Sequence, residues 1–476
     1  MDVYIKPSFS DIRSRFGPQI DISTKLAISC PKINTPIISA GMDTVTEDDM
    51  AIEIALNGGI GEIHRNNSAE KQAEFVKKVK EKMIVLEKDP PLISEEKTVF
   101  DALEILKKRK RDYVMIFGSN NFKGKISGIV TTKDLLAGES GTKLKKLATL
   151  LDAEGRRKLI YGSVGMTLEK AVKIMKEERI EKLPILDMDK NFAGVFTLKD
   201  HMLINDFPNA ALDEQGRLIV GGAIGVHEID IERALKLVEA GIDVLFLDIA
   251  HGHSVYTEEM VKRLKDKENL KVPIVVGNVA TKEGVMFAYG IGADAIKVGI
   301  GPGFVCKTRN VAGTGVPQIT AILEAKELLS KKRNAPPIIS DGGIREPGDL
   351  GKAIASGADS VMIGSILAGT DKSPGSLVKI NGGLKKHIRG MASKSVLEDR
   401  KKLSDTTTDA GLYTPEGRET FTPFQGSTKN LLMEYIGGLR SAMSYAGAHT
   451  IVELQRSKLI HINSSGGNEQ TRPLGF

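Results

Sequence analysis

Short apolar runs that end in Gly, Asp, Asn or Ser recur along the chain, and helical patterns separate the later ones. Strands that alternate with helices in this way are typical of a parallel sheet. The runs lie at residues 36–41, 61–65, 218–224, 244–250, 273–279, 295–299, 337–343 and 360–365, with helices expected at 230–239 and 347–355. Eight strands with intervening helices close naturally into an α/β fold, the (β/α)8 TIM barrel.

A repeat occupies the gap between the second and third runs, roughly residues 82–207. Residues 128–134 and 194–200 read alike, and each copy follows an amphipathic helix (98–107, 167–176) and a short apolar strand (113–117, 183–186). Repeats of this kind usually stack to bury a shared core. The pair resembles tandem cystathionine-β-synthase (CBS) domains, a small regulatory module whose clefts often take adenine nucleotides. A purely structural module is the alternative.

These patterns divide the chain into a catalytic barrel, residues 1–81 and 208–476, and an inserted tandem CBS regulatory domain, residues 82–207. From about 385 to 426 no strand pattern is clear, and the charged, Thr-rich stretch 398–414 is expected to be a long mobile loop. Loops of that length in a compact domain are usually functional or disordered. We therefore expect residues 385–426 to form a mobile flap over the barrel.

Composition excludes several classes of protein. A hydrophobic content of 41% with 27% charged residues is ordinary for a soluble globular chain. No apolar run approaches the ~20 residues of a membrane span and the polar start lacks a signal-peptide layout, so a cytoplasmic protein is expected. Cys30 and Cys306 offer no disulfide framework and no zinc pattern. The net charge of +6 is small and is spread through Lys-rich helices, so nucleic acid is not an expected partner.

The candidate chemistry centres on residues 297–309, where a strand runs into a glycine loop that ends on Cys306. Glycines there let main-chain groups approach a phosphate or a cation closely. Lys297, Lys307 and Arg309 are near enough in sequence to favour the Cys306 thiolate, the nucleophilic form of cysteine. The alternative is that the cysteine is a small buried hydrophobe.

Polar residues also follow the later strands. In a TIM barrel the carboxyl ends of the strands carry the active site, and the loops after strands seven and eight commonly bind phosphate. This rule points to residues 341–343 and 364–365. The alternative is that the glycines there only permit tight turns between strand and helix.

Seven motifs carry a family resemblance. They stand at residues 42–46, 248–254, 277–279, 299–306, 340–344, 389–391 and 437–441. Together they resemble the inosine monophosphate (IMP) dehydrogenase and guanosine monophosphate (GMP) reductase family. The resemblance covers essentially the whole chain, and the repeat pair lies where that family inserts its CBS module.

The resemblance implies a purine nucleoside 5′-monophosphate oxidoreductase that uses NAD or NADP. In the family, a cysteine adds to C2 of the purine ring and hydride passes between C2 and a nicotinamide. Water resolves the covalent intermediate in the dehydrogenase, whereas the reductase begins with loss of ammonia. Carried over by motif, Cys306 is the nucleophile and Thr308 helps to deliver the attacking or leaving group.

The same resemblance implies the binding residues. Asp341 would accept hydrogen bonds from the nucleotide ribose, while Met391 and Glu416 would lie against the purine. The phosphate would be held by Gly343, Gly364 and Ser365, and the cofactor by Asp248, Asn278 and Gly299. Main-chain carbonyls of Gly301, Gly303 and Cys306 would bind a potassium ion, completed by the tail of a neighbouring subunit in a homotetramer or octamer.

Two departures from the family pattern affect the phosphate site. Phe304 stands where dehydrogenases usually have a serine, and Ile388 stands where an aromatic residue commonly precedes Arg-Gly-Met. Each change removes a hydrogen bond to the phosphate. The phosphate is therefore expected to depend more on backbone donors, or to bind more weakly.

Other departures affect the direction of the reaction. Arg400 stands in approximate register with the flap arginine that activates water in dehydrogenases, but Lys401 replaces the tyrosine beside it, and Lys394 replaces an acidic residue typical of reductases. Residues 414–417 and 440–443 favour the dehydrogenase, whereas residues 13–16 favour the reductase. We expect an IMP dehydrogenase that forms xanthosine monophosphate (XMP). GMP reductase is the alternative, and a nucleotide sensor that has lost turnover is a third possibility.

Overall fold

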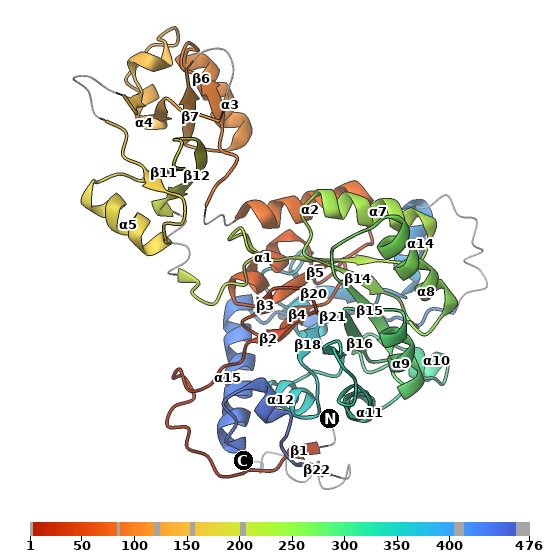
Figure 1. The fold of residues 1–476 in the computed structure, drawn as a ribbon. Helices are drawn as coiled ribbons and strands as arrows, with labels where there is room; N and C mark the ends of the chain where they lie inside the picture. Colours follow the sequence, from red (N-terminus) through yellow and green to blue (C-terminus); the bar gives the residue numbers. More distant parts are fainter. Residues whose placement is uncertain are drawn as a thin grey trace. The chain divides into compact units, whose positions relative to one another are not determined.

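The computed structural model describes residues 3–82, 86–118, 124–152, 158–199, 206–403 and 414–462. The chain forms two compact units (Figure 1). One unit combines Met1–Lys82 with Asn209–Phe476, and the other is Met83–Pro208. Among the described residues, no helix combines the length and the apolar character that a membrane crossing requires.

The larger unit is built on a closed barrel of eight parallel strands in the order β13-β14-β15-β16-β17-β18-β4-β5. The strands are β4 (Ile37–Ser39), β5 (Ile60–Ile63), β13 (Gly221–Ile224), β14 (Val244–Asp248), β15 (Ile274–Val279), β16 (Ala295–Val298), β17 (Ile338–Asp341) and β18 (Ser360–Ile363). All eight lie within the predicted runs or within one residue of them, so the predicted (β/α)8 fold is confirmed. Strands buried on both faces read as continuous apolar runs, which is why the sequence shows them.

Side chains fill the inside of the barrel. Phe246 is fully buried there, among Ile38, Val275, Ile339 and other aliphatic residues. The ring occupies the space where a Cβ at Gly221 on the neighbouring strand would lie. A large residue beside a glycine therefore packs this layer, and the carboxyl ends of the strands are left for polar groups.

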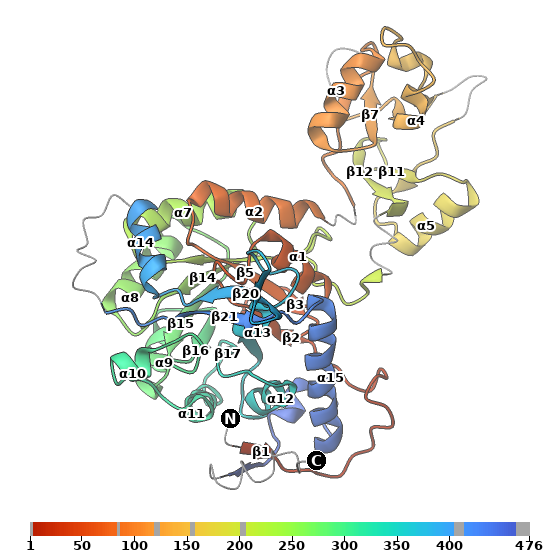
Figure 2. The same ribbon diagram turned by 180° about the vertical axis from the view of Figure 1, so that it is seen from behind.

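Helices surround the barrel (Figure 1). They are α1 (Asp48–Leu56), α2 (Ala69–Lys82), α7 (Glu228–Glu239), α8 (Val255–Lys262), α9 (Lys282–Gly290), α11 (Gln318–Leu329) and α12 (Pro347–Ala355). The helices predicted at 230–239 and 347–355 are confirmed as α7 and α12. Helix α12 begins with Pro347 in its first turn and a reciprocal cap between Glu346 and Asp349. Helix α15 (Thr428–Ala446) packs along α12 (Figure 2).

The expectation that residues 385–426 lack strands was wrong. Strands β19 (Val378–Ile380), β20 (Gly383–Arg389) and β21 (Glu419–Pro423) form an antiparallel sheet, and α14 (Lys394–Leu403) covers part of the expected loop. The sequence of β20 does not show the alternation of apolar and polar residues that is typical of a strand, because a charged residue, Lys386, occupies a buried position. Its ammonium donates to the carbonyls of Thr370 (3.0 Å) and Ser373 (2.5 Å). Residues 404–413 of the expected loop lie outside the described residues.

The smaller unit contains two sheets. Strands β6 (Leu92–Ser94), β7 (Tyr113–Phe117), β8 (Gly128–Thr131) and β9 (Thr149–Leu150) form one sheet, and β10 (Gly162–Ser163), β11 (Lys182–Leu186) and β12 (Phe192–Thr197) form the other. Helices α3 (Val99–Arg109), α4 (Thr132–Leu135) and α5 (Leu168–Glu177) accompany them. Thr98 and Thr167 accept hydrogen bonds at the starts of α3 and α5, so the two halves begin alike.

A shared core joins these two halves. Tyr113 and Met115 from the first half and Leu186 and Val195 from the second belong to one buried cluster. The predicted stacking of the repeats is therefore confirmed.

The two ends of the described chain meet in a short sheet. Strand β1 (Val3–Ile5) pairs antiparallel with β22 (Leu459–His461). The rest of the tail, predicted to reach a neighbouring subunit, lies outside the described residues.

Candidate active site

Cys306 lies in the loop between β16 and a short helix, α10 (Thr308–Val311). Gly299 takes φ +149° at the start of this loop, and a Cβ there would meet the carbonyl oxygen of Asp341. The Cys306 amide donates to the Gly303 carbonyl (3.1 Å), and Cys306 pairs with Gly417 in an isolated bridge. Contacts on both sides therefore fix the cysteine at the carboxyl end of the barrel.

A chain of hydrogen bonds leads away from the thiol. Cys306 Sγ donates to Thr308 Oγ1 (3.3 Å), and that hydroxyl donates to Glu416 Oε2 (2.6 Å). The Lys307 amide donates to the Glu416 carbonyl (2.6 Å), which holds the glutamate in place. The thiol, hydroxyl and carboxylate form a path along which a proton can move to or from a group bound at the cysteine.

The expectation that Lys297 supports the Cys306 thiolate was wrong. Lys297 Nζ lies 2.7 Å from Asp248 Oδ1 and 3.0 Å from Asp341 Oδ2, and the side chain is only 2% exposed. A buried ammonium requires carboxylate partners, and these lie inside the barrel. Burial alone would lower the pKa of Lys297, but Asp248 and Asp341 outweigh it and raise that pKa.

The structure brings four of the predicted binding residues together. Asn278 Nδ2 donates to Asp341 Oδ2 (2.7 Å) and to the Gly299 carbonyl (2.7 Å). Asp248 lies on the other side of Lys297. Burial opposes ionisation of Asp248, but Lys297 outweighs it and lowers the pKa of that carboxyl. Asn278 Oδ1 is buried without a hydrogen-bond partner within the described part of the chain, so an acceptor remains for a ligand donor.

Arg400 reaches this cluster from α14. Burial and the nearby Arg65 lower its pKa to about 10, while Asp248 and Asp43 act in the opposite direction. A guanidinium in water is effectively always charged. This position therefore makes loss of its proton easier than in solvent.

Arg389, at the end of β20, holds the helix that carries Arg400. Its guanidinium bonds to Ser395 Oγ (2.9 Å) and Asp399 (2.9 Å) on α14, and to Asp43 Oδ2 (2.5 Å) in the loop after β4. The role of Arg389 was not predicted, although it belongs to one of the seven motifs. Its Asp43 partner is 346 positions away in the sequence.

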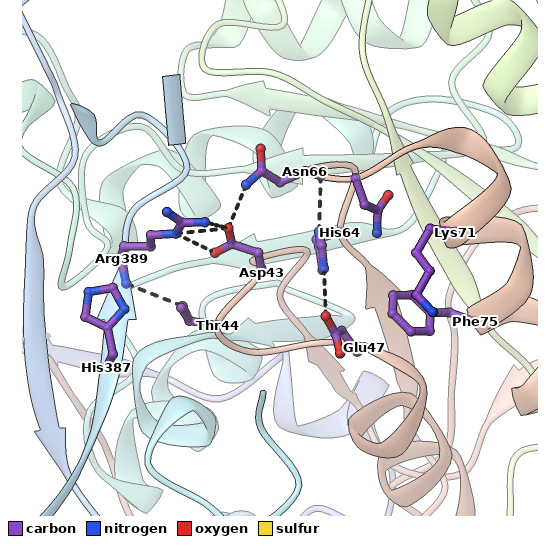
Figure 3. Close-up of a pocket in the computed structure, with 10 residues that line it drawn as sticks. Asp43, Thr44, Glu47, His64, Asn66, Lys71, Phe75, His387 and Arg389 are labelled. Carbon is purple, nitrogen blue, oxygen red and sulfur yellow. Dashed lines mark hydrogen bonds and ion pairs between the residues drawn. The ribbon is translucent and has the colours of Figure 1, made fainter. Parts of the chain in front are cut away.

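A cavity of about 370 Å³ adjoins this arginine (Figure 3). Asn66 donates to Asp43 (2.7 Å), and His64 lies 3.5 Å from Glu47. Arg389 points toward Asp43 and contacts it directly (Figure 3). Arg389 and Asp43 form an ion pair among the lining residues, whereas Lys71 pairs with Glu74, which does not line the cavity.

A second cavity, of about 400 Å³, lies beside Cys306. Its charged side chains are Arg309, Arg345 and Arg418, and the Arg418 guanidinium lies 5.8 Å from the Phe304 ring centroid. A cavity whose charged side chains are all cationic attracts anions.

One of the loops predicted to hold phosphate lies against the loop that carries Cys306. Gly342, beside Gly343, lies against the Cys306 loop, since a Cβ at Gly342 would be 3.1 Å from the Gly303 nitrogen. Gly364 precedes helix α13 (Ser365–Ala368), and Met391 follows β20. Their contacts with a nucleotide stay predictions.

The fold and these contacts define a class: a TIM-barrel protein with a cysteine, a hydroxyl and a carboxylate in hydrogen-bonded sequence at its catalytic face. The family model described as "IMP dehydrogenase / GMP reductase domain" matches residues 1–472. The chain belongs to this family of oxidoreductases.

Similar proteins include both IMP dehydrogenases and a GMP reductase. Inosine-5′-monophosphate dehydrogenase of Nitrosopumilus maritimus is 40% identical, over 99% of this chain and 97% of the relative. The Aquifex aeolicus protein of the same name is 41% identical, over 98% and 93%. A crystal structure of a cysteine-to-alanine variant of Trypanosoma brucei GMP reductase with guanosine 5′-monophosphate has a TM-score of 0.85 at 36% identity, covering 100% of this chain and 97% of that one.

Proposed function

We propose that the protein is an IMP dehydrogenase, which converts IMP, NAD and water to XMP and NADH for guanine nucleotide biosynthesis. Curated dehydrogenases at about 40% identity over nearly the whole chain support this direction. Cys306 adds to C2 of IMP, and bound NAD supplies the hydride acceptor. The Thr308 hydroxyl, held by Glu416, positions the water that releases the product.

The observation that carries the direction is the environment of Arg400. With its pKa lowered to about 10, the neutral guanidine of Arg400 is more populated at neutral pH than it would be in water. Neutral Arg400 can take a proton from water, which only the dehydrogenase needs. Dehydrogenases have a tyrosine beside this arginine, and Lys401 replaces it here. Burial of Arg400 and the Thr308–Glu416 pair compensate for the absence of that tyrosine.

Isotope-labelled water tests the direction of the reaction, because it shows where the new oxygen of the product comes from. In the dehydrogenase, the new C2 oxygen of XMP comes from water, so turnover of IMP and NAD in heavy-oxygen water must give labelled XMP in the mass spectrum. A product without that oxygen would contradict hydrolysis of a C2 adduct.

GMP reductase is the second candidate function. The likeness to the Trypanosoma brucei reductase favours it, as does Lys401 beside Arg400. In that direction the Thr308–Glu416 pair would protonate the departing ammonia. A sensor without turnover has less support, because the Cys306–Thr308–Glu416 chain is intact.

The nucleotide ribose is held by Asp341, in this proposal. Both hydrogen bonds to its side chain, from Lys297 and Asn278, use Oδ2, which favours Oδ1 as the acceptor for ribose hydroxyls. Backbone groups of Gly343 and Gly364 and the Ser365 hydroxyl hold the phosphate, and the arginines of the neighbouring cavity add charge where Phe304 and Ile388 provide no hydrogen bond. Met391 and Glu416 face the purine.

We expect Asp341→Ala to raise the Michaelis constant for IMP and to lower turnover. Each charge-assisted bond to a ribose hydroxyl contributes about 1.5–3 kcal/mol, or roughly 10- to 150-fold. Steady-state kinetics over a range of IMP concentrations measure both effects, with exposed Asp189→Ala as the control. An unchanged Michaelis constant for IMP would place the ribose elsewhere.

Asp248, Asn278 and Gly299 hold the cofactor, and the buried free oxygen of Asn278 fits a ligand donor there.

For potassium, the carbonyls of Gly301, Gly303 and Cys306 are ligands of the right kind. The Gly303 carbonyl already accepts the Cys306 amide, so ligands beyond this loop are required. A bound potassium ion would stabilise the loop that carries the cysteine. NADP as the alternative cofactor and the homotetramer or octamer rest on the family resemblance, and the cytoplasmic location rests on the sequence pattern.

Residues 83–208 act as a tandem CBS regulatory domain that binds an adenine nucleotide. A cavity of about 320 Å³ in this unit supports the proposal, because both halves line it, Thr131 and Asp134 from the first and Arg179 and Lys182 from the second. Lys158 and Arg179 at this cleft suit a phosphate-bearing ligand, whereas Lys182 is already paired with Asp112 and Glu181.

Deletion of residues 83–208, with a short linker between Lys82 and Asn209, should leave catalysis intact and abolish any response to adenine nucleotides. The barrel strands pair without this unit. Turnover with and without added ATP measures both effects in the full chain and in the deletion variant. Loss of soluble protein in the variant would show that the unit is structural.

A further inference from the structure

Glu62 is a buried acid that the proposed mechanism does not use. It lies on β5, its side chain is fully buried, and its two carboxylate oxygens have no hydrogen-bond donor within the described residues. Gly41 makes room for it, since a Cβ there would stand 2.7 Å from Glu62 Oε1. A buried carboxylate without a donor costs several kcal/mol, so its presence beneath the active site requires an explanation.

Charged groups from several strands face Glu62. Asp248 approaches from β14, Lys297 from β16 and Asp341 from β17, and each acts electrostatically on the glutamate. Arg65 and Arg400 act on Asp248 in turn. The ammonium of Lys297 bonds to Asp248 and Asp341. Lys297 thus has two carboxylate partners, whereas Glu62 has no ion pair within the described residues, so its burial favours the form that keeps a proton.

Contact between two carboxyl groups shows where that proton lies. The Glu62 and Asp248 side chains are within hydrogen-bond reach of each other, and two ionised carboxylates have no hydrogen to share. Burial and the charge of Asp248 raise the pKa of Glu62 well above its ordinary value. Asp248, which contacts Lys297 directly, has a lowered pKa. The proton therefore belongs to Glu62.

We propose that Glu62 is a positioning residue that stays protonated at neutral pH and donates a hydrogen bond to Asp248, fixing that carboxylate to receive the ribose of the nicotinamide cofactor. Lys297 extends the same network to Asp341, so one buried unit orients the acceptors for both ribose groups. The inference rests on the proposed role of Asp248 in cofactor binding.

The proposal has a definite pH dependence. Because the pKa of Glu62 is higher in the folded chain than in the unfolded chain, its protonated form contributes stability that is fully present only below the ordinary pKa of a glutamate. This contribution is lost as the pH rises through the folded-state pKa. Ionised Glu62 would also repel Asp248 and Asp341. The Michaelis constant for NAD should therefore increase at alkaline pH.

Two variants separate a proton-dependent role from simple packing. Glu62→Gln keeps a hydrogen-bond donor but does not ionise, whereas Glu62→Leu removes the donor and keeps similar bulk. We expect Glu62→Gln to remove the alkaline rise in the Michaelis constant for NAD. Glu62→Leu should raise that constant at every pH by about tenfold, which is ~1.4 kcal/mol, with a smaller effect on IMP. Exposed Glu434→Gln is the control. If Glu62→Gln keeps the wild-type pH profile, the proposal is wrong.

An infrared difference spectrum tests the proton without any turnover. The wild-type minus Glu62→Gln spectrum at neutral pH should contain the carbonyl band of a protonated carboxyl group, shifted in heavy water. Absence of this band would contradict a protonated Glu62. A band that is present in a protein that does not oxidise IMP would support the protonation of Glu62 and contradict only the proposed function.

Discussion

Cys306→Ala is expected to reduce turnover by at least about 10⁴-fold while nucleotide affinity stays within a few-fold of wild type. The thiol forms the covalent bond to C2, and removing a nucleophile costs far more in the transition state than in the ground state. The hydrogen bond from Cys306 to Thr308 and the position of the cysteine beside the arginine-lined cavity support this role. Steady-state rates and calorimetric titration with IMP measure the two quantities.

The chain has a matched control for this variant. Cys30 is the second cysteine, and it packs against the core cluster of the barrel, where burial raises the pKa of its thiol to about 12. Cys30→Ala should therefore retain full activity. Near wild-type turnover in Cys306→Ala would end the assignment of Cys306 as the nucleophile.

Arg400→Ala is expected to separate hydride transfer from hydrolysis. Hydride transfer needs Cys306 and the bound cofactor, so a burst of reduced nicotinamide should persist. Steady turnover should fall by about 10²- to 10⁴-fold, the usual contribution of a general base. Stopped-flow absorbance followed by steady-state measurement reports both phases. Arg456→Ala, at an exposed arginine outside the cluster, is the control.

The pH dependence supplies an independent check on Arg400. Because its pKa is lowered to about 10, the neutral fraction grows about tenfold per pH unit from neutral pH up to that value. The rate of hydrolysis in the wild-type protein should rise with pH over this range, and the rise should be absent in Arg400→Ala. Undiminished steady turnover in the variant would remove Arg400 from the mechanism.

The barrel could be predicted because its signals are local. Strands such as β14 and β15 are buried on both faces, so they appear as unbroken apolar runs, and Pro347 marks the first turn of α12. Cys306 ends one of the seven motifs and Thr308 stands two residues after it, so the sequence alone pairs them. The Glu416 contact with Thr308 spans 108 positions and depends on the fold.

The contacts of buried charges could not be predicted, because they join residues far apart in the sequence. Lys297 is close to Cys306 in sequence, yet its ammonium contacts Asp248, 49 positions away. Glu62 lies within the predicted strand at 61–65, and the charged groups that face it come from strands far along the chain. Strand β20 could not be predicted for a similar reason. Lys386 is charged but buried, because its ammonium donates to carbonyls from another part of the chain.

The central claim, oxidation of IMP, is tested most directly by the absorbance of the nicotinamide band with purified protein. IMP with NAD is supplied in one reaction and GMP with NADPH in another. We predict an increase in absorbance with IMP and NAD that depends on both substrates, and no change with GMP and NADPH. A decrease with GMP and NADPH, with no increase in the first reaction, would contradict the claim and identify the protein as a reductase.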